Sequence, residues 1–391
     1  MKSAVLVLGG YVNGYSIIRE LYDYSKSDII LFDDKRSLAT FSNKIKFYSI
    51  IKWEKNLLLN EIRKLHLEYE YIVIFPTDDL QLELLLDIYS DIKDYCFCPF
   101  NHHNLKESLN KFVQYSYCEE LGVPYPKSVN INSIDDYEKV NSIKLPVIIK
   151  PSKREDLKQE VFRSLKIESE FDIKSSEKKI KDLLDKGMSF IASEVIPGDS
   201  SNNIFAYTAY RNKKGHILNE WIGRKVTQYP DDYGVMSTTS NEAPEIIKEQ
   251  GRKLLNGMDL MGICEPEFKY DYRDHKYKLM EINLRSMMWN RVGNLSSVYL
   301  QYSQYLDALN VEVPKFKQTQ DEQIKFVYFK HELANLIYRK NYFSHFKENV
   351  FNTKKRNFAI FEIKDFKPFL WDILSTVKVV LNSCLKRLKV K

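Results

Sequence analysis

Residues 267–285, EFKYDYRDHKYKLMEINLR, determine how the rest of the chain is interpreted, because they contain two alternating stretches around a polar break. Each alternating stretch indicates a β-strand, and so short a break between two strands predicts a β-hairpin. Folding this hairpin about residue 274 places Glu267 opposite Glu281. Asn283 then lies on the same face as Glu281, since side chains two residues apart on a strand point to one side.

Two carboxylates that face each other across a hairpin repel and need an opposite charge nearby. A divalent cation supplies that charge, because carboxylate and amide oxygens are the ligands that Mg²⁺ binds together with waters and substrate phosphates. Arg285, further along the same face, is placed to hold a phosphate oxygen. The alternative is a surface hairpin whose glutamates pair with Lys269 and Lys278. The predicted metal ligands are Glu267, Glu281 and Asn283.

The composition is that of an ordinary globular protein, with 44% hydrophobic and 29% charged residues in 391. This length predicts two to three domains. The net charge of +6 is mild, and although basic residues concentrate at the C-terminus, we do not expect a nucleic-acid-binding protein. Five irregularly spaced cysteines and the lack of a signal peptide or a long apolar run predict a reduced, cytoplasmic protein without a transmembrane helix.

The first hundred residues alternate between apolar strands and helical patterns. Strands are expected at 4–8, 29–32 and 71–75, which predicts a parallel sheet with helices on both faces. The glycine turn at 9–14 has the spacing Gly-Gly-x-x-x-Gly, so a nicotinamide or flavin site is only an alternative to a plain tight turn. Asp79 follows the strand at 71–75, at the sheet edge where such folds bind ligands, and is a candidate substrate contact.

Three basic features occur in the middle of the chain. Lys111 begins a predicted helix, and Lys150 ends the apolar strand 145–151, where it needs an anion such as a phosphate or a snorkelling path to solvent. Arg224 and Lys225 are adjacent cations after a predicted strand. The polar stretch 153–166 is basic, and it either closes over a triphosphate or is a solvated run of charge. Its candidate phosphate contacts are Arg163 and Lys166.

The order of these features resembles the ATP-grasp superfamily. It is most similar to the carboxylate–amine ligase branch, which includes D-aspartate ligases and proteins of cell-surface polysaccharide biosynthesis. The resemblance spans about residues 3–310 and is strongest over 190–291. Its motifs are Glu-x-x-Pro-Gly at 194–198, Gly-Arg-Lys at 223–225, Gly-x-x-x-x-Glu at 262–267 and Glu-Ile-Asn-x-Arg at 281–285.

The resemblance implies an α/β and α+β fold class. A Rossmann-like domain at 1–104 would precede an ATP-grasp domain at 105–315, with a small appendage at 316–391. The two α+β subdomains of the ATP-grasp domain would meet near residue 190. A Rossmann-like domain in this place argues against a redox cofactor.

The resemblance also implies roles for single residues, with ATP and Mg²⁺, or Mn²⁺ in its place, as cofactors. Arg285 would stabilise the transferring phosphoryl group, and Arg224 would lie near the acylphosphate or the substrate carboxylate. Lys225 and Asp79 are further substrate candidates. The implied metal ligands are again Glu267, Glu281 and Asn283. The implied ATP contacts are Lys111 and Lys150 on phosphates, Glu194, Val195 and Ile196 on adenine through their backbone, and Asp199 on ribose.

Three features depart from the family pattern. The stretch from 151 to 186 lacks the glycines that many relatives have after the strand-end lysine. Ser286 stands where a proline often follows the arginine, and Glu265 competes with Glu267 as a metal ligand. These departures affect loop closure and the choice of ligands.

The implied reaction has two steps. A substrate carboxylate attacks the γ-phosphate of ATP to give an acylphosphate and ADP, and an amine then attacks the acylphosphate to give an amide and phosphate. Phosphoryl transfer depends mainly on positioning and charge neutralisation, which the metal, lysines and arginine would supply. The alternatives are a nucleotide-binding partner without catalysis in an envelope-assembly complex, and a Rossmann oxidoreductase.

The tail, 316–391, predicts a polar linker, strands at 324–329 and 358–361, and a final basic amphipathic helix within 366–391. Such a helix lies on an anionic membrane surface, packs on the body of the protein, or joins a second subunit in a homodimer. The first of these would place the protein at the inner face of the cell membrane.

Overall fold

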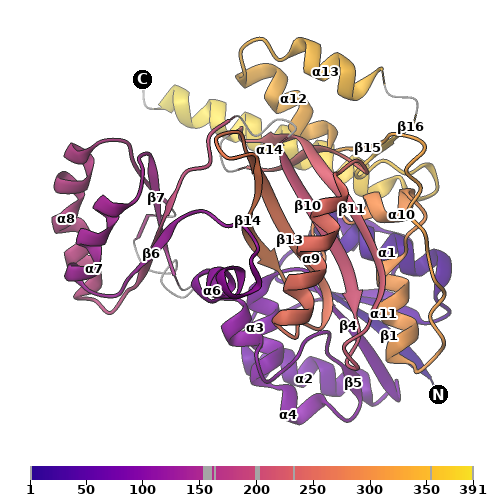
Figure 1. Cartoon of the computed structure of the whole chain (residues 1–391). Helices are drawn as coiled ribbons and strands as arrows, with labels where there is room; N and C mark the ends of the chain where they lie inside the picture. Colours follow the sequence, from indigo (N-terminus) through magenta and orange to yellow (C-terminus); the bar gives the residue numbers. More distant parts are fainter. Residues whose placement is uncertain are drawn as a thin grey trace.

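The computed structural model describes residues 2–152, 161–162, 164–198, 203–231, 234–352 and 355–389, with only the helical backbone for 379–389. The described chain forms three sheets (Figure 1). A parallel sheet and a long mixed sheet pack together. A smaller antiparallel lobe lies to one side of them.

The N-terminal unit is a parallel sheet in the order β3-β2-β1-β4-β5, as the alternating pattern predicts. The residues of β1 from Ala4 to Leu8 are fully buried, which explains their unbroken apolar run. Its strands are β1 (Ser3–Leu8), β2 (Asp28–Asp33), β3 (Phe47–Ile50), β4 (Tyr71–Pro76) and β5 (Cys96–Phe97). Its helices are α1 (Val12–Tyr24), η1 (Leu38–Phe41), α2 (Lys55–His66), α3 (Asp79–Asp87), α4 (Tyr89–Ile92) and α5 (Leu105–Ser108).

The glycine turn after β1 folds back on the protein. A Cβ atom on Gly14 would lie 1.9 Å from the carbonyl oxygen of Gly9, so the start of α1 packs against the turn itself. The backbone N–H of Gly10 donates to Asp33 Oδ2 at 2.8 Å, and Asp33 is buried. The acid that closes the second strand is therefore a partner of the turn, which favours the plain tight turn over a dinucleotide site.

The small lobe has the antiparallel order β6-β9-β7-β8. Ile149 and Phe190 from the sheet and Ile180 from α8 form part of its own buried core. Its strands are β6 (Ser128–Ile131), β7 (Val147–Pro151), β8 (Leu165–Ile167) and β9 (Phe190–Glu194), and its helices are α7 (Ile134–Glu138), η2 (Lys139–Ser142) and α8 (Glu170–Leu184).

The central sheet has the order β14-β13-β10-β11-β12-β15-β16. Helix α9 covers one face, where Leu254 packs with Phe205 and Ile222. Helices α10 and α11 lie between the other face and the N-terminal unit. The strands from the ATP-grasp stretch are β10 (Ile204–Arg211), β11 (Ile217–Tyr229), β12 (Val235–Ser240), β13 (Gly262–Asp271) and β14 (Lys276–Asn283). The helices are α6 (Lys111–Leu121), α9 (Glu245–Gly257), α10 (Arg291–Leu295) and α11 (Leu300–Ala308).

The tail joins the central sheet, because β15 (Ile324–Val327) pairs with β12 and β16 (Lys355–Phe358) pairs with β15. The second tail strand was expected at 358–361 and lies three residues earlier, where its residues are mostly polar. The final helix is present as α14 (Lys367–Lys389). The remaining tail helices are α12 (Phe329–Tyr338), α13 (Phe343–Val350) and η4 (Ile363–Asp365).

Two buried carboxylates attach the tail to the rest of the chain. Glu332 of α12 accepts hydrogen bonds from four hydroxyl groups at 2.6–3.1 Å, and it is fully buried. Asp365 accepts from the Tyr15 hydroxyl at 3.0 Å, which ties the tail to α1. The hydroxyl donors to Glu332 belong to Thr227, Ser237, Thr238 and Tyr342.

We expect Glu332→Ala to lower the free energy of unfolding by about 3 kcal/mol, because several buried hydroxyls lose their acceptor at once. Urea denaturation of the variant and of wild type measures this difference. Glu249→Ala, on an exposed position of α9, is the matched control and should change stability by less than about 0.5 kcal/mol. Equal stability of Glu332→Ala and the control would contradict the anchoring role.

Candidate active site

The predicted hairpin is present with the predicted register. Glu267 of β13 lies opposite Glu281 of β14, and Glu265 lies opposite Asn283. The register shifts only after Glu267, towards the turn. All four side chains therefore share one face of the central sheet, beside the small lobe.

Two lysines supply the positive charges opposite these carboxylates. Lys111 Nζ lies 2.5 Å from Glu281 Oε2, and Lys225 Nζ lies 2.6 Å from Glu267 Oε2. The second pair is nearly buried, with 9% of each side chain exposed. The repulsion between the glutamates therefore does not by itself require a metal ion. The alternative pairing of these glutamates with Lys269 and Lys278 is wrong, because both of those lysines have other partners.

The positive charges converge on Glu281. The ammonium of Lys111 holds the pKa of Glu281 well below its usual range, and burial opposes this shift without cancelling it. Lys150 and Lys225 lower the same pKa further, so Lys150 at the end of β7 acts on this face of the sheet. Burial alone would lower the pKa of Lys225, but Glu267 raises it on balance. Glu281 is thus ionised at neutral pH, and cations from three separate elements act on it.

Glu265 differs from its neighbour Glu267. Both of its carboxylate oxygens accept hydrogen bonds, from Thr208 Oγ1 at 3.0 Å and from Trp289 Nε1 at 2.9 Å. Its side chain is fully buried, and burial, with the nearby charge of Glu267, raises the pKa of Glu265 to about 8. Of the two glutamates that compete as a metal ligand, Glu267 is therefore the better placed.

The donor set fits a cation that arrives with a nucleotide. Glu267, Glu281 and Asn283 bring two carboxylates and one amide oxygen to one face. Within the described ranges, no three His, Cys, Asp or Glu side chains gather as a metal cage. Mg²⁺ is commonly held by one or two carboxylates together with substrate phosphates, so this sparse set fits it.

Arg285 and Asp79, predicted separately, form an ion pair. Arg285 Nε lies 2.6 Å from Asp79 Oδ1, at the first residue of α3 and just beyond β4. Asp79 raises the pKa of Arg285 against the opposing effect of burial. The pair therefore links the end of the hairpin to the N-terminal unit.

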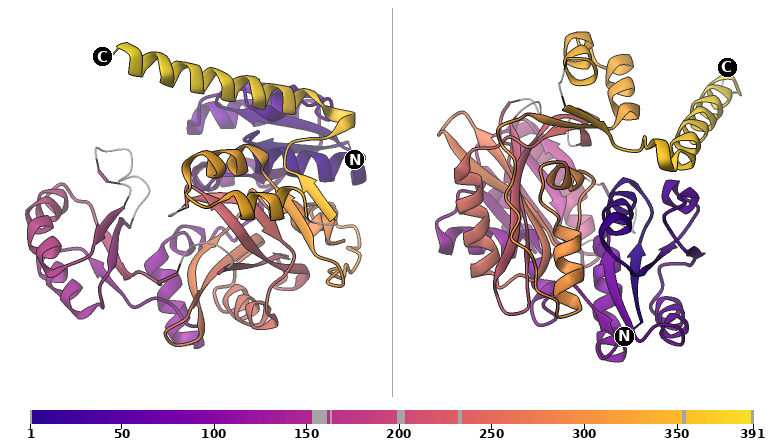
Figure 2. Two further views of the ribbon diagram at one scale, coloured as in Figure 1. Left: turned by 90° about the horizontal axis from the view of Figure 1, so that it is seen from above. Right: turned by 90° about the vertical axis from the view of Figure 1, so that its right-hand side faces the viewer.

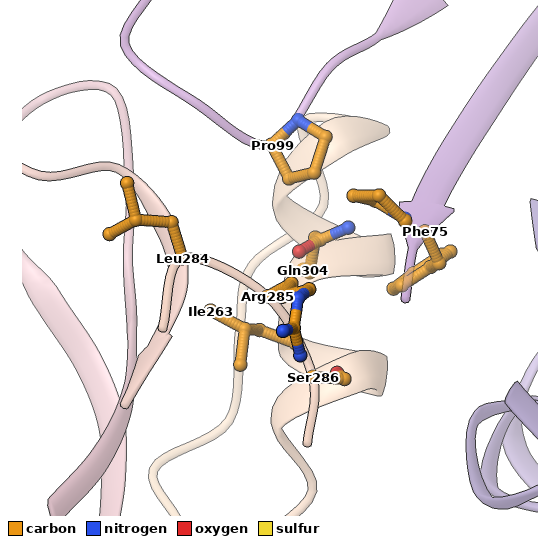
Figure 3. Close-up of a pocket in the computed structure, with 8 residues that line it drawn as sticks. Phe75, Pro99, Ile263, Leu284, Arg285, Ser286 and Gln304 are labelled. Atoms are coloured by element: carbon orange, nitrogen blue, oxygen red, sulfur yellow. The ribbon is translucent and has the colours of Figure 1, made fainter. Parts of the chain in front are cut away.

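A small cavity of about 10 Å³ lies beside this pair, lined by Arg285, Ser286, Gln304 and residues of both units (Figure 3). This volume holds about one water molecule. It is too small for a nucleotide or a substrate, so we assign the cavity no catalytic role. Its lining shows how closely the N-terminal unit and the central sheet meet at Arg285.

Arg224 and Lys225 point to opposite faces of β11. Strand pairing places Gly223 opposite Ala206, which in turn lies opposite Glu267, so Lys225 shares the face of the carboxylates. Arg224 lies on the other face, where its guanidinium is 2.7 Å from Glu242 Oε2. The structure therefore brings Lys225 into the cluster and does not bring Arg224 there.

The predicted adenine hinge, Glu194, Val195 and Ile196, is held by the β13–β14 hairpin. The Glu194 carboxylate lies 2.9 Å from Arg273 and 3.1 Å from Lys278. Lys269 Nζ donates to the carbonyl oxygen of Ile196 at 2.9 Å.

Two amides of this hinge already have partners inside the protein. The backbone N–H of Glu194 donates to the Lys127 carbonyl and that of Val195 to the Pro146 carbonyl, both at 2.9 Å. Contact with adenine through either of these two amides would have to replace the bond that it makes here. The contacts of the hinge to Arg273, Lys278 and Lys269 were not predicted. The sequence does contain one indication of these contacts. Lys269 and Lys278 lie opposite each other in the hairpin, and two facing lysines need acceptors from another part of the chain.

Two predicted contacts, Asp199 and Arg163, lie outside the described residues. Lys166, the alternative to Arg163, belongs to β8, and its Nζ lies 2.6 Å from Glu168 Oε1. A contact of Lys166 with phosphate stays a prediction.

Known proteins resemble this chain in sequence and in fold. No model of a known protein family matches the sequence. The chain is 25% identical over 306 residues to D-aspartate ligase of Enterococcus faecium (strain Aus0004), a match that covers 72% of this chain and 70% of the relative.

Two solved enzymes show the likeness in fold. N5-carboxyaminoimidazole synthetase from Staphylococcus aureus has a TM-score of 0.64 at 13% identity, covering 82% of this chain and 81% of that one. The β-γ-ATP complex of biotin carboxylase from Campylobacter jejuni also has a TM-score of 0.64 at 13% identity. This match covers 83% of this chain and 74% of that one. These likenesses confirm the expected fold, and with the ligase relative they confirm the resemblance to the ATP-grasp superfamily.

The opposite faces of β11 give a test of the two adjacent cations. We expect Lys225→Ala to weaken the binding of Mg·ATP at least about tenfold, because Glu267 loses its buried counter-charge. Arg224→Ala should change the same affinity less than about threefold, since its guanidinium pairs with Glu242 on the far side. Isothermal titration calorimetry measures both affinities. A larger loss of affinity in Arg224→Ala than in Lys225→Ala would show that Arg224, and not Lys225, belongs to the site.

The hinge contacts give a second test. We expect Arg273→Ala to weaken ATP binding about threefold to tenfold, because Glu194 loses one of the cations that position the hinge. Lys276→Ala removes an exposed cation of the same turn and should leave the affinity unchanged. Equal affinities for the two variants would show that the hinge does not depend on Arg273.

Proposed function

We propose, from the ATP-grasp fold and the resemblance to a D-aspartate ligase, that this chain is an ATP-dependent ligase that joins a carboxylate to an amine. The reaction would pass through an acylphosphate and release ADP and phosphate. Its substrates would be small molecules. A role in the synthesis of peptidoglycan or a cell-surface glycan, and a location in the cytoplasm, stay predictions.

The observation that carries this proposal is the charged cluster on the face of the β13–β14 hairpin. Glu267, Glu281 and Asn283 present oxygen donors, while Lys111 and Lys225 present ammonium groups to the same carboxylates. A bound Mg²⁺ would neutralise charge on the phosphates and polarise the group in transfer. The three oxygen donors would hold it. Lys111, relieved of Glu281, would then be available to a phosphate oxygen.

The residues around the cluster have separate tasks in this proposal. Lys150 comes from the small lobe and would hold phosphate from the opposite side. Arg285, kept in place by Asp79, would stabilise charge on the phosphoryl group as it moves to the substrate carboxylate. The hinge at Glu194 would receive the adenine ring. The acid and amine would approach from the side of the N-terminal unit, where Asp79 lies.

Turnover and the metal assignment are tested together. ADP release, followed by a coupled assay, should depend on the presence of both an acid and an amine. We expect Glu281→Gln to lower kcat at least about 100-fold, because the metal loses a charged ligand. We expect the variant to fold as wild type does, and thermal unfolding of both proteins measures this.

The control is Glu312→Gln, which removes an exposed carboxylate outside the site and should keep full activity. Full activity of Glu281→Gln would overturn the metal assignment. ATP binding without ADP release, across a broad panel of acids and amines, would favour the non-catalytic nucleotide-binding partner instead.

A further inference from the structure

Helix α14 is attached to the protein by one side of its first turns. The ring of Trp371 stacks on Phe41 of η1, with ring centroids 5.5 Å apart. Asp372, which is buried, accepts a hydrogen bond from the Tyr328 hydroxyl at 3.2 Å. These contacts fix which side of the helix faces the body of the chain.

The opposite side of the same turns is an exposed apolar stripe. Leu370, Ile373, Leu374 and Val377 recur at helical spacing, and each has between 44% and 67% of its surface exposed. Figure 2 shows α14 leaving the body of the protein as it runs towards its C-terminal end. Packing on the body, one of the alternatives from the sequence, therefore holds for Phe369, where the predicted stripe begins, whereas Ile373 and Val377 of that stripe remain largely exposed.

A second exposed apolar group lies on the helical pair α12 and α13. Ile337, Tyr338, Phe343 and Phe351 are each at least 65% exposed. Figures 1 and 2 show α12, α13 and α14 at the same end of the molecule. Large apolar side chains gathered at one end of a protein mark a surface that meets a partner.

The tail that carries these groups is strongly basic. Residues 324–391 contain 15 Lys and Arg against 5 Asp and Glu, a net charge of +10, whereas the whole chain has +6. The first 323 residues therefore carry −4. Three of the five tail acids, Glu332, Asp365 and Asp372, are buried in the attachments described above. No acid follows Asp372, although five basic residues do.

We propose that helices α12, α13 and the first turns of α14 dock this protein on an anionic phospholipid surface, with the exposed stripe of Leu370, Ile373, Leu374 and Val377 inserted at the level of the headgroups. Exposed apolar side chains flanked by cations are the composition that such surfaces bind. Among the helices of the described residues, none combines the length and apolar character needed to span a membrane.

Two other occupants fit the surface less well. A second copy of the chain would bring the same +10 charge to the interface, and like charges oppose that contact. A nucleic acid would match the cations but would leave the apolar stripe without a partner. The docking proposal does not depend on the ligase proposal, because none of its residues belongs to the candidate active site.

Vesicle flotation of the full chain tests the docking. We expect binding to vesicles of phosphatidylcholine with phosphatidylglycerol at least about tenfold above binding to phosphatidylcholine alone, and a decrease as salt is raised. The double variant Ile373→Glu with Leu374→Glu should lose at least about tenfold of that binding, because two apolar side chains on the stripe become charged. These positions are exposed, so the variant should fold, and circular dichroism checks this.

Leu67→Glu is the matched control, since Leu67 is 87% exposed at the end of α2 in the N-terminal unit. It should bind vesicles as wild type does. No preference of wild type for the anionic vesicles, or unchanged binding by the double variant, would overturn the proposal. A dimer in sedimentation velocity that the double variant abolishes, without vesicle binding by wild type, would assign the stripe to a second copy instead.

Discussion

The face of the candidate active site depends on two lysines that neutralise two opposed glutamates. Lys225 and Glu267 are almost fully buried, so each charge is costly unless the other is present. Lys111 and Glu281 are about one-third exposed and pair at 2.5 Å. A buried ion pair is weak evidence for stability, since well-packed apolar residues often stabilise a fold as much. The proposed function accounts for the cluster in another way, because its members would exchange partners when charged ligands bind.

The same pairs determine how the elements of the site are arranged. Lys111 begins α6, the helix that leads to the small lobe, and Lys225 belongs to the middle of the central sheet. Arg285 and Asp79 join the end of the hairpin to the N-terminal unit, and Glu194 joins the turn of the hairpin to the small lobe. The hairpin therefore makes charged contacts with every unit that surrounds the proposed nucleotide site.

Local sequence patterns predicted much of this structure, but they could not predict contacts between residues that are far apart in the sequence. Alternation and a short turn were sufficient to place Glu267 opposite Glu281, because hairpin register is a local property. The pairing of Lys111 with Glu281 joins residues 170 positions apart, and no periodicity encodes it. For Arg224 and Lys225, the face that each occupies depends on how β11 pairs with β10 and β13, so the sequence could not separate them. The tail strands likewise became part of the central sheet through pairing with β12, which their own residues do not indicate.

The attachment points of the tail bear on how the proposed docking and the proposed catalysis would coexist in one chain. Asp365 and Trp371 connect the tail to the N-terminal unit, and Glu332 connects it to the central sheet. A surface that holds the tail would therefore hold these two units together. The small lobe has its own core, and it meets the hairpin through ion pairs at Glu194, a hydrogen bond from Lys269 to the Ile196 carbonyl and the apolar packing of Ile191. Most apolar side chains of the lobe pack within the lobe itself, so little apolar packing would be lost if the lobe that carries Lys150 shifted on the hairpin as a nucleotide bound.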